Sequence, residues 1–414
     1  MLVRDIDARI IKDSRKEDTI EVEVITKDGR FTASAPSGKS KGIHEAEAFS
    51  SRGNDFSIAF AKAMGKKLGE KELLVFDDLK ILEDYARKLD NSDNWSIIGA
   101  NTLYALEAAL LKAIAASQGQ ELWRFLCNKP GILPLPLGNC IGGGKHVKQD
   151  TKTDIQEFLI LPKTKSFYDA YFINLQAYKI AKQILVERDK RYEGILTDEK
   201  AFASTLENEE VLQLLSEVRE VIKNKFGITL QLGVDVASSS FFVNKYYYYN
   251  NPAKKLKKED QIAHMINLIE KYNLSYIEDP LNEEDFEGFK KLKEHIDSSN
   301  IKCMVCADDL TATQFDRVER AVNENCMHAM IIKPNQNGSI LQTKRIVDFA
   351  KSRGINCVMS HRSGETLDNT IAHLATGWQI PIIKTGILGK ERFAKLHELL
   401  RIEREISKKQ ISKS

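Results

Sequence analysis

Residues 303–308 read Cys-Met-Val-Cys-Ala-Asp, which is a short apolar run that ends in a carboxylate. Similar apolar runs, each closed by a charged side chain or a histidine, recur through the second part of the chain. The closing residues are Asp235, Glu278, Asp308, Lys333, His361 and Lys384. By subtraction they lie 23 to 43 residues apart, about one strand plus one helix. Because continuous apolar runs are typical of parallel strands buried on both faces, the sequence predicts repeated βα units.

Two earlier segments follow the same pattern. Residues 155–161 carry Glu157, and residues 194–197 lead to Asp198 and Glu199. A series of βα units favours a TIM-type barrel, in which side chains at the carboxyl ends of the strands line the active-site mouth. The sequence therefore predicts one cavity that contains carboxylates, lysines, a histidine and an arginine.

The first part of the chain has a different character. Residues 19–24 and 29–35 flank a Lys-Asp-Gly turn, which is typical of a β-hairpin. Helical patterns follow over residues 56–68, 77–89 and 97–117. The densest Pro and Gly segment begins at Asn128, and we place a domain boundary there.

The composition excludes several classes of protein. Lys and Arg number 61 and Asp and Glu number 59, which gives a net charge of +2. Because basic residues are not concentrated anywhere, we expect no nucleic-acid partner. The N-terminus has no apolar signal core, and charged and polar residues interrupt the most apolar segment, residues 97–116. We therefore expect no membrane span and a cytoplasmic location.

Six cysteines are spread along the chain, and Cys303 and Cys306 form a CxxC motif. A zinc site of this type needs a second CxxC, which the sequence does not contain. The motif lies in an apolar run, so we interpret it as two buried strand thiols.

Three carboxylates at neighbouring strand ends would converge in the predicted cavity. Asp235, Glu278 and Asp308 would repel one another unless a cation neutralised them, and hard oxygen ligands suit Mg²⁺. Lys333 and Lys384 come from later strands of the same mouth. Nearby cations lower the pKa of a lysine, so that it can act as a base. This layout fits the removal of a proton next to a carboxylate.

Ordered motifs extend from residue 14 to about residue 405. The most specific are Ser-His-Arg-Ser-Gly-Glu-Thr at 360–366 and Ile-Lys-Thr-Gly at 383–386; others lie at 37–46, 134–146, 156–158, 235–239, 277–280, 307–311 and 332–336. Together they resemble the enolase family. The resemblance implies an α/β protein. Its N-terminal α+β capping domain would span residues 1–130 and carry a mobile active-site loop. A modified (β/α)8 TIM-type barrel that opens with two antiparallel-type strands would span residues 131–414.

The resemblance also implies a cofactor and a reaction. Asp235, Glu278 and Asp308 would hold one Mg²⁺, and Ser40 would hold a second together with the substrate phosphate. The implied function is reversible, Mg²⁺-dependent dehydration of 2-phosphoglycerate to phosphoenolpyruvate in glycolysis or gluconeogenesis. The implied partners are this small phosphorylated acid and a second copy of the chain, in a homodimer or an assembly of dimers.

The catalytic roles follow from the same resemblance. Lys333 matches the general base that takes the C2 proton, and Glu199 matches the general acid that expels the hydroxyl. The remaining implied site residues bind the substrate or support the acid: His146, Glu157, His361, Arg362, Ser363 and Lys384.

The chain departs from the family pattern beside two of these residues. Glu199 is followed by Lys200 and Ala201 where two glycines are usual. Lys39 and Lys41 flank Ser40 where smaller or neutral residues are usual. The metal, base and phosphate residues therefore match the family more closely than the acid and loop regions do.

Other functions compete with this interpretation. Residues 33–40 fit a relaxed phosphate-loop motif, but that motif needs a helix that starts at the lysine, and Gly42 would break it. A degenerate enolase-like binding or scaffold protein is a second alternative. A superfamily enzyme for another acid substrate is a third, although Arg362 and Ser363 favour a phosphorylated one.

Overall fold

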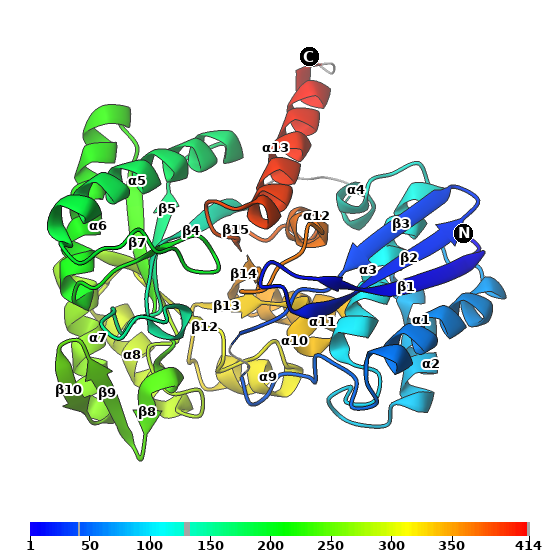
Figure 1. Cartoon of the computed structure of the whole chain (residues 1–414), viewed down its shortest axis with the longest axis horizontal. Helices are drawn as coiled ribbons and strands as arrows, with labels where there is room; N and C mark the ends of the chain where they lie inside the picture. Colours follow the sequence, from blue (N-terminus) through cyan, green and yellow to red (C-terminus); the bar gives the residue numbers. More distant parts are fainter. Residues whose placement is uncertain (40–41, 128–132, 412–414) are drawn as a thin grey trace.

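The structure is a computed structural model that describes residues 1–39, 42–127 and 133–411. The predicted domain boundary between residues 130 and 131 lies outside the described residues. Figure 1 shows an antiparallel sheet with helices at one end of the molecule and a barrel at the other. Helix α13 (Lys390–Ile411) projects between them.

The N-terminal part is an antiparallel sheet packed against helices. Its strands are β1 (Asp5–Lys12), β2 (Asp18–Thr26) and β3 (Gly29–Ser34), in that order. The predicted hairpin is confirmed, since Thr26 of β2 pairs with Gly29 of β3. The helices are α1 (Asn54–Gly69), a 3-10 turn η1 (Phe76–Asp78), α2 (Leu79–Leu89), α3 (Ala100–Ser117) and α4 (Leu122–Leu126). Helix α3 is apolar around most of its circumference, and nearly all of its side chains are accordingly buried.

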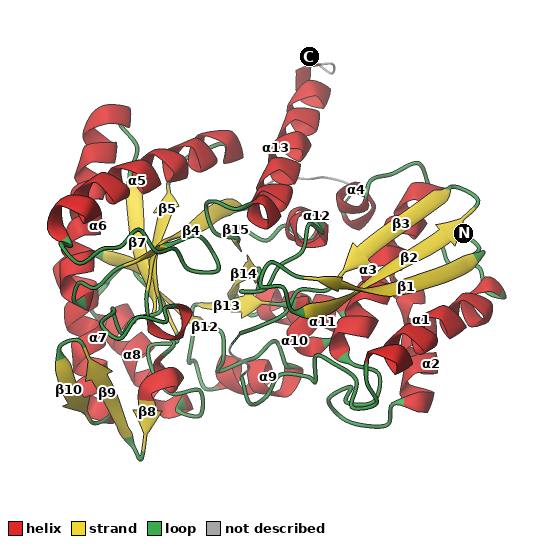
Figure 2. Cartoon of the chain, in the orientation of Figure 1, coloured by secondary structure: helices red, strands yellow, loops and turns green. Residues whose placement is uncertain are grey.

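The second part contains a closed barrel of eight strands (Figure 2). They are β4 (Leu135–Gly142), β5 (Glu157–Pro162), β7 (Leu230–Asp235), β11 (Leu274–Glu278), β12 (Met304–Ala307), β13 (Ala329–Ile332), β14 (Asn356–Ser360) and β15 (Ile382–Lys384). Parallel pairing of β15 with β4 closes the ring. Six of these strands coincide with the apolar runs that end at Asp235 to Lys384, so that part of the sequence pattern is confirmed.

Strand β5 runs against both of its neighbours. Glu157 is therefore the first residue of its strand, yet it pairs with Asp235, the last residue of β7. The reversal brings the start of β5 to the same end of the barrel as the carboxyl ends of the other strands. Glu157 thus reaches the active-site mouth from the opposite chain direction.

The prediction of a barrel strand over residues 194–197 is wrong. These residues form a loop in which Leu196 makes a single bridge to Phe202. The nearby strand, β6 (Phe202–Ala203), has only two residues and pairs with β4 at one edge of the sheet. The segment is too short and too exposed at Ile195 and Leu196 to act as a buried barrel strand.

Helices and one small sheet surround the barrel. The helices are α5 (Phe167–Arg188), α6 (Asn208–Phe226), α7 (Lys258–Tyr272), α8 (Phe286–Ser298), α9 (Phe315–Asn323), α10 (Pro334–Asn337), α11 (Ile340–Ser352), α12 (Thr370–Gly377) and the 3-10 turns η2 (Gly144–His146) and η3 (Ser238–Phe241). The small sheet holds β8 (Phe242–Val243), β9 (Tyr246–Asn250) and β10 (Ala253–Leu256). Within the described ranges, no helix has the length and apolar character to cross a membrane. Cys303 and Cys306 are buried free thiols, as predicted.

Two glutamates of the N-terminal part cap the N-terminus of α11, a helix of the barrel. Glu107 of α3 is fully buried and accepts hydrogen bonds from the backbone N–H groups of Ile340 and Leu341, the latter at 3.2 Å. Glu83 of α2 contacts the hydroxyl of Ser339, the N-cap of α11. Carboxyl oxygens at a helix N-terminus accept hydrogen bonds from N–H groups that have no partner within the helix. The N-terminal part therefore caps a helix of the barrel.

We expect Glu107→Ala to lower the free energy of unfolding by about 2–4 kcal/mol, because two buried N–H groups lose their acceptor. Glu107→Gln keeps an oxygen acceptor. Burial, and then the charge of Glu83, raise the pKa of Glu107 well above its usual value. A raised pKa means that the stabilising contribution of Glu107 is lost as pH rises through the folded-state pKa, so the Gln variant should gain on wild type as pH rises.

Thermal unfolding from about pH 5 to pH 8 measures both effects. The exposed Glu319→Ala on α9 serves as the matched control and should melt like wild type. Equal unfolding midpoints for Glu107→Ala and wild type would show that the buried carboxylate is not needed as a cap.

Candidate active site

A cavity of about 230 Å³ lies at the mouth of the barrel, and both parts of the chain line it. The described N-terminal contributors are Gly38, Lys39, Gly42, Ile43 and Glu45. The predicted site residues that line it are His146, Glu157, Glu199, Asp235, Asp308, Lys333, His361, Arg362, Ser363 and Lys384. Glu278 joins them through Lys384, while Ser40 lies outside the described residues. The structure therefore brings the described part of the predicted site together.

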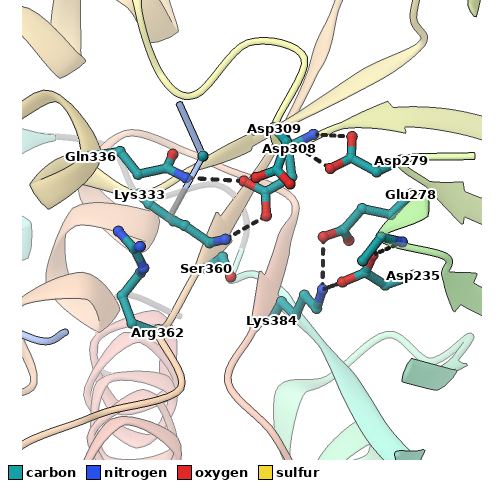
Figure 3. Close-up of polar contacts among 12 residues, drawn as sticks. Asp235, Glu278, Asp279, Asp308, Asp309, Lys333, Gln336, Ser360, Arg362 and Lys384 are labelled. Atoms are coloured by element: carbon teal, nitrogen blue, oxygen red, sulfur yellow. Dashed lines mark hydrogen bonds and ion pairs between the residues drawn. The ribbon is translucent and has the colours of Figure 1, made fainter. Parts of the chain in front are cut away.

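The ammonium group of Lys384 lies among three carboxylates, of which Figure 3 shows Glu278 and Asp235. Its Nζ is 2.8 Å from Glu278 Oε1, 3.1 Å from Asp235 Oδ2 and 2.9 Å from Glu157 Oε2. Burial lowers the pKa of Lys384, but these carboxylates outweigh burial and raise the pKa well above its usual value. Lys384 is therefore a fixed cation rather than a base.

Lys333 is paired with one carboxylate only. Its Nζ contacts Asp308 Oδ2, as Figure 3 shows. Burial lowers the pKa of Lys333, but the charge of Asp308 outweighs burial and raises it. The prediction that neighbouring cations lower this pKa is therefore wrong for the protein in this state, because Asp308 is closer than Arg362 or Lys384 and of opposite charge.

Two carboxylates and two histidines form another part of the cavity wall, next to Lys384. His361 Nε2 lies 3.4 Å from Glu199 Oε2, and His146 Nδ1 lies 3.6 Å from Glu157 Oε1. Asn139 Nδ2 donates a hydrogen bond of 3.1 Å to Glu199 Oε2. All of these side chains are nearly or fully buried, so charge on any of them is costly unless it is paired.

The proton of this wall belongs to Glu157 rather than to Glu199. Burial, and then the charge of Glu199, raise the pKa of Glu157 well above its usual value. Burial also raises the pKa of Glu199, but the charge and hydrogen bond of His361 outweigh it and hold that pKa well below its usual value. Burial lowers the pKa of His361 to about 4, so the imidazole is neutral at neutral pH. A general acid needs a raised pKa, and in the substrate-free protein the raised pKa is that of the carboxyl next to the predicted acid.

An ion pair with the N-terminal part fixes the position of the Arg362 side chain. Its Nη2 is 2.8 Å from Glu45 Oε2, and its Nη1 donates to Asn335 Oδ1 at 3.2 Å. Ser363 Oγ accepts a hydrogen bond of 2.7 Å from the backbone N–H of Lys39. Arg362 and Ser363 are consecutive residues, and both line the cavity. A guanidinium and a hydroxyl group are suited to bind a phosphate.

Several residues that support the site were missed as functional residues by sequence reasoning. Asp279 accepts hydrogen bonds from the backbone N–H groups of Asp308 and Asp309, at 2.9 and 2.8 Å. Gln336 Nε2 donates to Asp308 Oδ1 at 3.2 Å (Figure 3). Asp279 directly follows a strand-end carboxylate, and that position is the signal that could have identified it.

The loop that follows Glu199 adopts a conformation that glycine would favour. Lys200 has a φ of 65°, in the left-handed region. Tyr178 Oη donates a hydrogen bond of 2.5 Å to the Lys200 carbonyl, and the Lys200 side chain is exposed while Ala201 is fully buried. Lys200 and Ala201, which stand where the family usually has two glycines, therefore still form a turn with a left-handed residue, and the Lys200 side chain is directed to solvent.

The carboxylates fit a divalent cation. Asp235, Glu278 and Asp308 are buried, and burial together with the charge of Asp235 raises the pKa of Glu278 to about 8. Such a concentration of negative charge already attracts the ammonium groups of Lys333 and Lys384. Buried carboxylate oxygens at adjacent strand ends are the ligands that Mg²⁺ prefers, so the donor set fits the predicted metal.

The atoms of the predicted trio are not gathered as closely as those of two other sets. Among the residues that the structure describes, two groups place their ligand atoms within 4.8 Å of one another: His146, Glu157 and Glu199, and Asp279, Asp308 and Asp309. Lys384 lies between Asp235 and Glu278, which accounts for the wider spacing of the trio.

The phosphate-loop alternative is not supported by the backbone. A phosphate loop requires a helix that begins at its lysine, here Lys39. Residues 42–53 form turns and irregular structure, and the first helix begins at Asn54. The run at 33–40 is therefore not the start of a nucleotide-binding helix.

Comparison with known proteins gives consistent matches over nearly the whole chain. A family model described as the enolase N-terminal domain matches residues 3–126, and one described as the enolase C-terminal TIM barrel domain matches residues 130–413. The chain is 38% identical over 417 residues to the enolase of Archaeoglobus fulgidus, covering 99% of this chain and 98% of that protein. It is 40% identical over 406 residues to the enolase of Methanocorpusculum labreanum, covering 97% and 98%. The enolase of Thermoplasma acidophilum is 34% identical over 407 residues, covering 97% and 98%.

Proposed function

Since the chain belongs to the enolase family, and is therefore a lyase of the phosphopyruvate hydratase type, we propose that it dehydrates 2-phosphoglycerate reversibly to phosphoenolpyruvate in a reaction that requires Mg²⁺. The observation that carries the proposal is the meeting of Lys333, Arg362 and the strand-end carboxylates in one cavity. The reversibility lets the same site serve glycolysis or gluconeogenesis.

The metal has a limited part in this proposal. Asp235, Glu278 and Asp308 would hold it, and Ser40 would hold a second ion with the substrate phosphate. When bound, Mg²⁺ supplies positive charge that stabilises the additional negative charge on the substrate carboxylate after the C2 proton is removed. Lys384, fixed among three carboxylates, adds a positive charge from the protein.

The side chains of the chain perform the proton transfers. Arg362 and Ser363 hold the phosphate, so that the C2 hydrogen faces Lys333. The ion pair that keeps Lys333 protonated would be weakened with Mg²⁺ at Asp308, so that neutral Lys333 removes that proton. Glu199, ionised in the substrate-free protein, takes the proton held by Glu157 and delivers it to the departing hydroxyl. Glu157 carries this proton in the substrate-free protein, and the imidazoles of His361 and His146 lie 3.4 and 3.6 Å from the two carboxyls. Burial of the wall excludes water from the transfer.

The direct test follows the appearance of the enol-pyruvate absorbance band from 2-phosphoglycerate with Mg²⁺. We expect turnover in both directions and none after chelation of the metal. A folded protein that turned over neither substrate in excess Mg²⁺ would contradict the proposal and favour the scaffold alternative. Hydrolysis of ATP without turnover of 2-phosphoglycerate would also contradict it.

We expect Asp308→Asn to raise the Mg²⁺ concentration needed for half-maximal activity about tenfold or more, because one anionic ligand becomes neutral. Activity should partly return at high Mg²⁺. A titration of activity against Mg²⁺ measures this shift, and the exposed Asp55→Asn on α1 is the matched control. An unchanged Mg²⁺ requirement would show that Asp308 is not a ligand.

The assembly of the protein is proposed on family membership alone. We propose a homodimer or an assembly of dimers. Light scattering of the purified chain measures its mass in solution, and a mass of one chain at all concentrations would contradict this part of the proposal.

A further inference from the structure

Lys39 lies in the cavity and has no part in the steps above. Its backbone N–H donates to Ser363 Oγ at 2.7 Å, so the residue lies directly against the end of the cavity assigned to phosphate. The hydroxyl of Ser363 also accepts from Arg15 Nη1 at 3.4 Å, which leaves its own proton available for a bound anion. The Lys39 side chain lines the cavity and is only 25% exposed.

The ammonium group of Lys39 is held loosely. Its Nζ lies 3.8 Å from Asp198 Oδ2, which is beyond hydrogen-bond distance. The Asp198 side chain is 41% exposed, and an ion pair of this kind contributes little in water. Lys39 can therefore leave Asp198 at small cost if a stronger anion enters the cavity.

Of the other described cations that line the cavity, Lys145 is exposed at the mouth, and the remaining three are already paired with carboxylates. Arg362 pairs with Glu45, Lys333 with Asp308, and Lys384 with the carboxylates at its strand end. A phosphate ester carries a charge of about −1.5 to −2 near neutral pH and meets several carboxylates on entry. A loosely paired cation beside Ser363 would offset that repulsion more readily than a cation already in a close ion pair.

We propose that Lys39 binds the phosphate of the substrate beside Arg362 and Ser363, and that Asp198 holds its ammonium group when no substrate is bound. This inference rests on the proposed function and names a specificity residue for the same site. It predicts that replacing Lys39 and replacing Asp198 change KM for 2-phosphoglycerate in opposite directions. Loss of Lys39 removes a phosphate contact, whereas loss of the Asp198 charge releases Lys39 for the phosphate.

The experiment measures KM for 2-phosphoglycerate in Lys39→Met, Asp198→Asn and Lys39→Arg. We expect KM to rise about tenfold in Lys39→Met, since a hydrogen bond to a charged group is lost, and to fall about threefold in Asp198→Asn. Lys39→Arg should stay near wild type because the charge is kept. Lys145→Met removes an exposed charge at the same mouth and should change KM less than about twofold.

Equal increases of KM in Lys39→Met and Asp198→Asn would overturn the inference, because they would mean that the pair only joins two loops. Equal increases of KM in Lys39→Met and Lys145→Met would also overturn it, because any positive charge at the mouth would then attract the substrate equally well. Binding of inorganic phosphate to wild type and Lys39→Met, measured by calorimetry, separates the two proposals. Weaker phosphate binding to Lys39→Met in a chain without 2-phosphoglycerate turnover would refute the proposed function and support the Lys39 contact.

Discussion

Replacement of Lys333 by alanine is expected to abolish exchange of the substrate C2 proton with deuterated solvent and to lower kcat by about 10²–10⁴-fold or more. Lys333 stands at the end of β13, and its amine reaches the cavity beside Asp308. The exchange experiment isolates proton removal from the later loss of hydroxyl.

Fold and metal binding provide the controls for this variant. Lys333→Ala should unfold at nearly the wild-type temperature and still bind Mg²⁺, because Asp308 and the other carboxylates remain. The exposed Lys290→Ala on α8 should exchange the C2 proton at the wild-type rate. Wild-type exchange in Lys333→Ala would mean that another group is the base.

Replacement of Glu199 by glutamine is expected to stop dehydration, with a loss of about 10²–10⁴-fold, and to leave C2 proton exchange in place. Proton removal precedes loss of the hydroxyl, so a variant without the acid can still complete the first step. Glutamine keeps the shape of the side chain and the contact with Asn139 while it removes the ionisable group. Parallel measurements of exchange and of enol-pyruvate absorbance on the same sample give the two rates.

Glu157→Gln is the matched comparison, since Glu157 holds the proton of the carboxyl pair in the substrate-free protein. We expect a smaller loss of dehydration than in Glu199→Gln, because Glu199 still stands next to His361. If Glu199→Gln dehydrated 2-phosphoglycerate at the wild-type rate while Glu157→Gln did not, the roles of the two carboxyls would be reversed.

The barrel could be predicted where strand direction and apolar runs agree. The six runs that end at Asp235 to Lys384 are parallel strands buried on both faces, so each leaves one unbroken apolar segment in the sequence. The reversed direction of β5 could not be predicted from its residues, because an apolar run looks the same in either direction. The prediction of a barrel strand over residues 194–197 was wrong for a related reason, because a short apolar run also fits a surface loop.

The members of the site were easier to predict than their protonation. Charged residues at strand ends share one mouth whatever the details of packing, so their convergence follows from topology. The pKa of Glu199 depends on the position of His361 and that of Glu157 on its depth of burial. Neither quantity is contained in local sequence. Neutral partners such as Gln336 escaped notice because an amide beside a helix start has no distinctive pattern.

The cap that Glu107 and Glu83 place on α11 has a consequence for how the chain unfolds. The first turn of α11 follows the segment that carries Lys333. The backbone N–H groups of Ile340 and Leu341 donate to Glu107 of α3, and the Gln342 side chain donates to Glu83 of α2. If the N-terminal part melted first, the two backbone N–H groups at this buried helix start would lose their acceptor together. The two parts are therefore coupled thermodynamically, and heating should give one cooperative transition rather than two separate ones.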